Sequence, residues 1–244
     1  MTISLHWAAR RRSGLQARCG RKAATMSSRT ATSYSSNSMS EPEDPKAQAA
    51  LAAIERGFPP AGAVAQSDSA QLLILGSFPS LQSQAKGQYY GHERNHFWRL
   101  VCGYAGMAEL PEAYEERVRI AEALGMIIWD MIAVCRRRTS ADDGLEILSL
   151  NNIEGLLEQH PSILRIGLNG SLSARLFLSA VARKPASFLP QAGSRAFLEL
   201  AGTMREVFRL PSTSPVPSSR FRTYDDRAAL WFRFFAVPPS LGTC

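Results

Sequence analysis

The apolar residues of this 244-residue chain follow two different periods, and the two periods alternate along the sequence. Short apolar runs bounded by glycine or polar residues predict buried strands at 70–77, 125–135, 162–170 and 205–210. We expect the second of these runs to pass from a strand into a loop. Helical spacing predicts helices at 45–58, 95–104, 111–123, 151–161, 171–182 and 225–237. Strands that alternate with helices predict an α/β fold, with helices on both faces of one sheet.

Three polar loops leave the carboxyl ends of predicted strands, which is where ligand sites gather in sheets of this kind. Loop one (76–98) reads "GSFPSLQSQAKGQYYGHERNHFW" and combines small hydroxyls, glycines, aromatic rings and amides. Loop two (129–143) places Asp130 directly after a strand, followed by three consecutive arginines at 136–138. Loop three (210–222) begins "LPSTSP" and ends with Arg220 and Arg222.

The residue types in these loops suit contacts with nucleic acid. Small hydroxyls and glycine amides can bind phosphate, and tyrosine or phenylalanine rings can stack against a base. Each feature also has a plainer structural interpretation. These are a buried core for Phe97 and Trp98, a helix cap for Asn95, a turn cap for Asp130, a solvated face for 136–138, and turn formation for Ser212 and Ser214.

Composition narrows the class of protein. No apolar run approaches the roughly 18 residues that a membrane-spanning helix needs. The four cysteines (Cys19, Cys102, Cys135 and Cys244) are scattered without a CxxC pair, and the four histidines show no ligand spacing with them. We therefore expect neither a bound metal nor a disulfide framework.

The net charge of +7 comes entirely from the N-terminal segment. Residues 1–40 contain six arginines, one lysine and no acid, which leaves 21 basic and 21 acidic side chains in the remainder. We expect a basic tail over 1–45 and one domain over 46–244. The tail has the composition of a mitochondrial or plastid leader or of a disordered arm. If translation starts at Met39 instead, a cytoplasmic, nucleoid-associated protein is expected.

The order of motifs along the chain is more specific than any one of them. "GSFPS…YY…NHFW", then "WD…C-R", then "NGSLSARLF", then "LPSTSP" resembles the uracil-DNA glycosylase superfamily and, within it, the hypoxanthine (deoxyinosine) DNA glycosylase branch. The resemblance spans Leu72 to Phe235. It implies a three-layer α/β/α sandwich with a short, mostly parallel central sheet. It also implies a monomer that flips a deaminated base, hypoxanthine or uracil, out of double-stranded DNA and hydrolyses its N-glycosidic bond without a cofactor.

The resemblance also implies roles for residues of the three loops. Many members of the superfamily orient water with Asp or Asn just before the proline of loop one, where this chain has Phe78, so the catalytic role is assigned to the amide of Asn95. The implied base-binding residues are Tyr89, Tyr90, Asp130 and Phe78. Phosphate contacts are expected from Ser77, Ser80, Ser212, Thr213 and Ser214. The segment from Val216 to Arg222, with Arg220 and Arg222, is the expected DNA wedge.

The number of lysines predicts whether the enzyme only removes the base or also cuts the DNA backbone. A glycosylase that also cuts the DNA backbone normally needs an amine nucleophile, and after the tail only Lys46, Lys86 and Lys184 remain. We therefore expect a monofunctional enzyme that leaves an abasic site. A non-catalytic protein that binds DNA lesions or single strands stays open as an alternative. A small-molecule hydrolase or nucleotide-binding protein is disfavoured, because no nucleophile elbow, P-loop or glycine fingerprint is present.

Overall fold

The computed structural model describes residues 53–65, 70–137, 144–216 and 220–236, all of which belong to the unit Pro42–Cys244. The predicted basic tail and most of the helix predicted at 45–58 lie outside the described residues. Within the described part, no helix has the length and apolar character that crossing a membrane would require.

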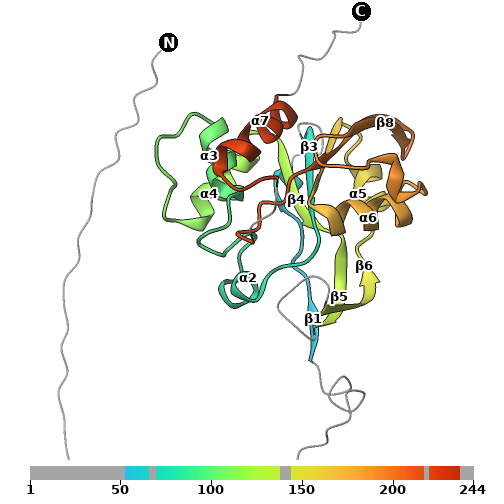
Figure 1. Cartoon of the computed structure of the whole chain (residues 1–244), viewed down its shortest axis with the longest axis horizontal. Helices are drawn as coiled ribbons and strands as arrows, with labels where there is room; N and C mark the ends of the chain where they lie inside the picture. The colour runs from blue at the N-terminus through green and yellow to red at the C-terminus, as the bar shows by residue number, and fades with distance from the viewer. Residues whose placement is uncertain (1–52, 66–69, 138–143, 217–219, 237–244) are drawn as a thin grey trace, which may run out of the picture. The chain divides into compact units, whose positions relative to one another are not determined.

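The centre of the fold is a six-stranded sheet with the order β2-β4-β3-β7-β9-β8 (Figure 1). Its strands are β2 (Ala61–Gly62), β3 (Leu72–Gly76), β4 (Met126–Asp130), β7 (Arg165–Asn169), β8 (Arg195–Leu200) and β9 (Thr203–Leu210). The four inner strands run parallel, and the edge strands β2 and β8 are antiparallel to their neighbours. Parallel neighbours require crossover connections, which here contain most of the helices.

Helices cover both faces of this sheet (Figure 1). One face carries α3 (Phe97–Tyr104), α4 (Tyr114–Ala123) and α7 (Tyr224–Phe235). The other carries α5 (Ile153–Gln159) and α6 (Ser171–Ala180). The predicted three-layer α/β/α sandwich is therefore confirmed, and each of these helices lies within or close to its predicted range.

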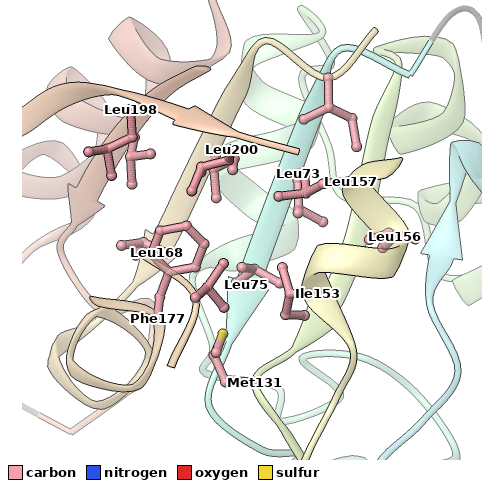
Figure 2. Close-up of a cluster of buried hydrophobic side chains, with 14 of the residues drawn as sticks. Leu73, Leu75, Met131, Ile153, Leu156, Leu157, Leu168, Phe177, Leu198 and Leu200 are labelled. Carbon is pink, nitrogen blue, oxygen red and sulfur yellow. The ribbon is translucent and has the colours of Figure 1, made fainter. Parts of the chain in front are cut away.

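The two hydrophobic cores meet at β3, because successive side chains of a strand point to opposite faces. Leu72 and Ile74 pack under α3 and α7, whereas Leu73 and Leu75 pack under α5 and α6. Figure 2 shows the second core, with Leu73 and Leu75 facing the side chains of α5 and with Phe177 of α6 beside them. Burial on both faces explains why this strand is a continuous apolar run.

A second, antiparallel sheet has the order β1-β5-β6 and consists of β1 (Ile54–Arg56), β5 (Ile132–Arg137) and β6 (Leu145–Leu150). Figure 1 shows it beyond the carboxyl end of β4, from which β5 continues after one residue. Two predictions were wrong here. The run at 125–135 is two strands in two sheets, and Ile54–Arg56 is a strand because pairing with β5 overrides its helical composition.

Several elements were not predicted. The edge strands β6 and β8 expose apolar side chains such as Leu148 and Phe197, so their sequences lack a simple alternation. The short helix α2 (Leu81–Lys86) lies inside loop one and is capped by Ser80 at its start and by Gly87 in the left-handed conformation at its end. Two short 3₁₀ turns, Ala63–Ala65 and Ala186–Phe188, complete the described elements.

Candidate functional site

The carboxyl ends of the four parallel strands bring the three polar loops to one edge of the sheet. Gly76 at the end of β3 is paired with Asp130 at the end of β4, and Asn169 at the end of β7 is paired with Leu210 at the end of β9. Loop one, loop two and loop three therefore begin beside one another. The sequence predicted this gathering from the alternation of strands and helices and from the polar loops that follow the strands.

Gly76 allows an unusually close approach of two polar side chains. A Cβ atom at this position would overlap with Oδ1 of Asp130 and lie 3.1 Å from the Tyr90 hydroxyl oxygen. Asp130 is buried. We call Gly76, Tyr90 and Asp130 the base-recognition cluster. It unites two of the predicted base-binding residues, Tyr90 and Asp130, at the junction of loops one and two.

Tyr90 is held by an uncommon backbone conformation and by stacking. Its φ is 53°, in the left-handed region, and its ring stacks on Phe97 with centroids 3.9 Å apart and planes 30° apart. Burial, followed by the charge of Asp130, raises the pKa of Tyr90 well above its usual range, and the nearby side chain of Asn169 opposes this shift only in part. The buried hydroxyl makes no hydrogen bond within the described part of the chain. The hydroxyl therefore keeps its proton and can donate it in a hydrogen bond.

Tyr89 points into the core. Its hydroxyl donates to the carbonyls of Phe58 and Pro59, both at 3.2 Å, and its ring meets Phe58 edge-on. The Trp98 indole donates to the Tyr89 carbonyl at 2.8 Å. The structure thus brings Tyr90 into the base-recognition cluster and gives Tyr89 partners in the core. The base-binding role of Tyr89 stays a prediction.

Asn95 begins the last turn of loop one before α3. Its Oδ1 accepts the N–H of Phe97 at 2.9 Å, and its own N–H donates to the His92 carbonyl at 2.8 Å. The N-cap of α3 is His96, which makes no side-chain cap bond, so Asn95 is the residue before the cap and not the cap itself. Its bond to Phe97 leaves the Nδ2 group and the second lone pair of Oδ1 for other partners. Phe97 and Trp98 are buried core residues, as the plainer alternative also predicted.

Thr213 ties loop three to the end of β7 and to loop one. Its N–H donates to Oδ1 of Asn169 at 3.0 Å, and its hydroxyl accepts from Nδ2 of Asn169 at 2.9 Å. Its carbonyl accepts the N–H of His96 at 3.0 Å, which fixes loop three to the residue after Asn95. Sequence analysis gave Asn169 no role; its position at the end of a buried strand was the signal that could have identified it.

His96 lies between positive groups. Burial lowers its pKa first, and the guanidinium groups of Arg227 and Arg99 lower it further. The imidazole is therefore neutral at neutral pH. Its buried Nδ1 has no hydrogen-bond partner among residues 53–65, 70–137, 144–216 and 220–236.

Ser212 of loop three borders a small cavity of about 160 Å³ at the amino end of α6. Ser212 is exposed, and its Oγ accepts the N–H of Ser214 at 3.2 Å. The Ser212 carbonyl accepts from the buried Arg227 at 2.9 Å. The cavity is lined by Gly170, Ser171, Arg209, Ser212, Val216 and Arg227, among others. Two arginines and the amino end of a ten-residue helix make it favourable for an anion.

The other predicted phosphate and wedge residues lie around this edge. Ser80 caps α2 by accepting the N–H of Ser83 at 3.2 Å, and the Ser77 carbonyl accepts the N–H of Ile132 at 3.1 Å. Arg220 donates to Gln191 at 2.9 Å, and Arg222 is exposed beside the start of α7. Val216 is 71% exposed, the highest value among the large apolar side chains described.

No group of three or more histidine, cysteine, aspartate or glutamate side chains could hold a metal ion within the part of the chain that the structure describes. Of the four cysteines, Cys102 and Cys135 are described, and both are free and buried.

The arrangement of loops around a short parallel sheet has counterparts among known proteins. The family model of the uracil DNA glycosylase superfamily matches residues 64–234, which is most of the chain. The chain belongs to the uracil DNA glycosylase superfamily. The predicted family is thereby confirmed, and the matched residues include all three loops and every strand of the six-stranded sheet except β2.

Two curated members of this superfamily resemble the chain in sequence. A protein of Methanosarcina acetivorans named hypoxanthine DNA glycosylase is 35% identical over 117 residues, which cover 48% of this chain and 72% of that protein. A protein of the same name from Methanosarcina barkeri is 29% identical over 119 residues, which cover 49% of this chain and 73% of that protein.

A solved structure of the superfamily also resembles the chain. It is the solution NMR structure of a candidate uracil DNA glycosylase from Methanosarcina acetivorans, with 28% identity and a TM-score of 0.56. The match covers 75% of this chain and 97% of the other. The α/β/α fold is thus shared with a member of the superfamily over nearly that member's full length.

Proposed function

We propose that this glycosylase turns a deaminated base, hypoxanthine in preference to uracil, out of duplex DNA and hydrolyses its N-glycosidic bond to leave an abasic site. The observation that carries the proposal is the base-recognition cluster, in which Asp130 and Tyr90 converge on Gly76 at the end of two parallel strands. The names of the two Methanosarcina relatives favour hypoxanthine as the base.

The chemistry of Asp130 supports selection of deaminated bases. Deamination replaces an exocyclic amine with a carbonyl and puts a proton on the neighbouring ring nitrogen, N1 in hypoxanthine and N3 in uracil. A carboxylate oxygen accepts a hydrogen bond from that N–H. It repels the lone pair that adenine or cytosine has at the same place. Asp130 would therefore read the atom that distinguishes the damaged base from the normal one.

Tyr90 and Asn95 supply the groups that the bond cleavage needs. Glycosidic cleavage passes through an oxocarbenium-like state, with negative charge developing on the departing base. The Tyr90 hydroxyl, which keeps its proton, would donate a hydrogen bond to that base. Asn95 would hold the attacking water through its amide. Because an amide is a weak base, its contribution would be orientation more than proton removal.

The cavity beside α6 supports a grip on the DNA backbone. Its lining by Ser212, Arg209 and the amino end of α6 suits a phosphate group, and Ser77 and Ser214 lie in the flanking loops. The exposed Val216 would enter the base stack, with Arg220 and Arg222 contacting the strand nearby. Ser80 and Thr213 already hydrogen-bond Ser83 and Asn169, and their contacts with phosphate stay predictions.

The enzyme would be monofunctional and act as a monomer. Lys86 lies at the end of α2, and its ammonium group is 3.5 Å from Glu93 on the exposed surface.

The test is base release from a labelled duplex that contains a single hypoxanthine or uracil, scored by alkali cleavage, for the natural protein and for Asn95→Ala. We expect release of hypoxanthine by the natural protein. The Asn95→Ala variant should bind the same duplex but lose release. Binding without release by the natural protein on both bases would instead indicate a non-catalytic lesion-binding protein.

A further inference from the structure

The second of the three consecutive arginines is directed into the protein, in contrast to the first. The side chain of Arg137 is 6% exposed, whereas that of Arg136 is 35% exposed and pairs at 3.4 Å with Glu146 on the surface. The plainer interpretation of this run of three positive charges was a solvated face, but the run contains a buried guanidinium at the end of β5.

Arg137 links the small sheet to the first turn of loop one through three contacts. Its Nε lies 3.1 and 3.0 Å from the two carboxylate oxygens of Glu55 in β1. Its Nη2 donates to the carbonyl of Pro79 at 2.6 Å. Its guanidinium plane lies over the ring of Phe78, with Cζ 5.4 Å from the ring centroid. One planar, multidentate cation therefore fixes a carboxylate, a carbonyl and an aromatic ring together.

The corner that Arg137 holds is next to the base-recognition cluster in the chain. Phe78 and Pro79 follow Gly76 and Ser77, whose carbonyls accept the N–H groups of Met131 and Ile132 after Asp130. Phe78 is 8% exposed and packs with Ile132 and Cys135 of β5.

The far end of the same segment is held as well, because the Gln84 amide in α2 donates to the Arg56 carbonyl of β1 at 2.9 Å. The small sheet therefore supports both ends of the segment that starts loop one.

We infer that Arg137 is a positioning residue that sets the Phe78–Pro79 corner and thereby the discrimination between hypoxanthine and uracil. This rests on the proposed function. At this corner a large, buried ring is held by a cation. Purine and pyrimidine bases differ in size, so a displaced ring at this corner changes the two release rates unequally. Lysine cannot replace Arg137, because an ammonium group is a compact charge that lacks the guanidinium fork.

The experiment compares Arg137→Lys with the matched neighbour Arg136→Lys, each of which keeps the charge. Single-turnover release of hypoxanthine and of uracil is measured at saturating protein, together with duplex affinity at two salt concentrations and thermal unfolding. We expect Arg137→Lys to slow hypoxanthine release by about tenfold or more, since small misplacements of a site carry penalties of that order. The ratio of hypoxanthine to uracil release should change, with duplex affinity retained. Arg136→Lys should match the natural protein in every measurement.

Glu55→Gln provides a second variant that leaves Arg137 in place and removes only its carboxylate partner; we expect a smaller change in the same ratio. An unchanged ratio in both Arg137→Lys and Glu55→Gln, with hypoxanthine release intact, overturns the inference while the proposed function stands. If Arg136→Lys and Arg137→Lys lose the same duplex affinity, and the loss depends on salt, both arginines contact phosphate directly. That outcome also overturns the inference. No release of either base by the natural protein overturns the proposed function, and this inference with it.

Discussion

The carboxylate of Asp130 and the hydroxyl of Tyr90 converge on the Cα atom of Gly76, so closely that a Cβ there would overlap with Asp130 and lie 3.1 Å from the tyrosine oxygen. The two side chains come from different loops. They can approach each other at the end of β3 because Gly76 has no Cβ atom there. This relationship joins the buried sheet directly to the proposed chemistry.

Replacing Gly76 with alanine should displace Asp130 and abolish selective release of hypoxanthine. We also expect a loss of about 1–3 kcal/mol in the free energy of unfolding, because overpacking a tight interior site has that cost. Single-turnover release and urea denaturation measure the two effects. Gly106→Ala is the control: its φ is 79°, but no atom lies within 4 Å of the added Cβ. It should cost about 1 kcal/mol by backbone strain and leave release unchanged. Normal release of hypoxanthine by Gly76→Ala would contradict the proposed role of the base-recognition cluster.

Replacing Tyr90 with phenylalanine keeps the stack on Phe97 and removes the hydroxyl. We expect hypoxanthine release to fall about a hundred- to a thousandfold, as when one donor to developing negative charge is removed. The natural protein should show no loss of rate from tyrosine ionisation between pH 7 and 9, because the raised pKa of Tyr90 keeps the donor protonated. A rate that falls with tyrosine ionisation in this range would contradict the assignment.

The same shift predicts how stability depends on pH. Since the pKa of Tyr90 is raised on folding, its contribution is fully present below the unfolded value of about 10 and is lost as pH rises above it. The free energy of unfolding should therefore decrease above about pH 10, and Tyr90→Phe should make that decrease shallower. Urea denaturation from pH 8 to 11 measures both slopes.

Replacing Thr213 with valine should loosen loop three from the strand that holds it. Valine has nearly the same shape but leaves Nδ2 of the half-buried Asn169 without this acceptor, which costs about 1 kcal/mol. Because Thr213 also holds His96, we expect slower base release as well as a lower unfolding temperature. Thr213→Ser keeps the hydroxyl and should restore the rate. Equal rates for the valine and serine variants would show that the Asn169 contact does not act on the site.

A borohydride-trapping experiment tests the proposed monofunctional chemistry. No covalent protein–DNA adduct should form during release of hypoxanthine, because no described lysine is placed for Schiff-base formation. Lys86 is on the surface near Glu93, and the ammonium group of Lys184 lies 5.8 Å from the Phe188 ring centroid. An adduct that disappears in Lys86→Ala would make Lys86 a nucleophile and the enzyme a lyase.

The local pattern of the sequence determined most of the central architecture. The run at 72–76 is apolar at every position before Gly76, so it had to be a strand buried on both faces. Asn95 directly precedes the N-cap of α3, and Asp130 is the last residue of β4. These features depend on neighbours in the chain, which is why periodicity and residue type were sufficient to predict them.

Adjacent residues of the same type cannot be told apart by the sequence pattern, and only the tertiary structure decided which of them enters the site or the core. Tyr90 rather than Tyr89 meets Asp130, and Arg137 rather than Arg136 is buried. These choices depend on partners distant in the chain, since Glu55 is 82 residues from Arg137 and Asn169 is 44 residues from Thr213. A local pattern records how much of a side chain is buried on average, but not which distant donor or acceptor it meets. The strands were therefore readable from the sequence, and the contacts between loops were set only by folding.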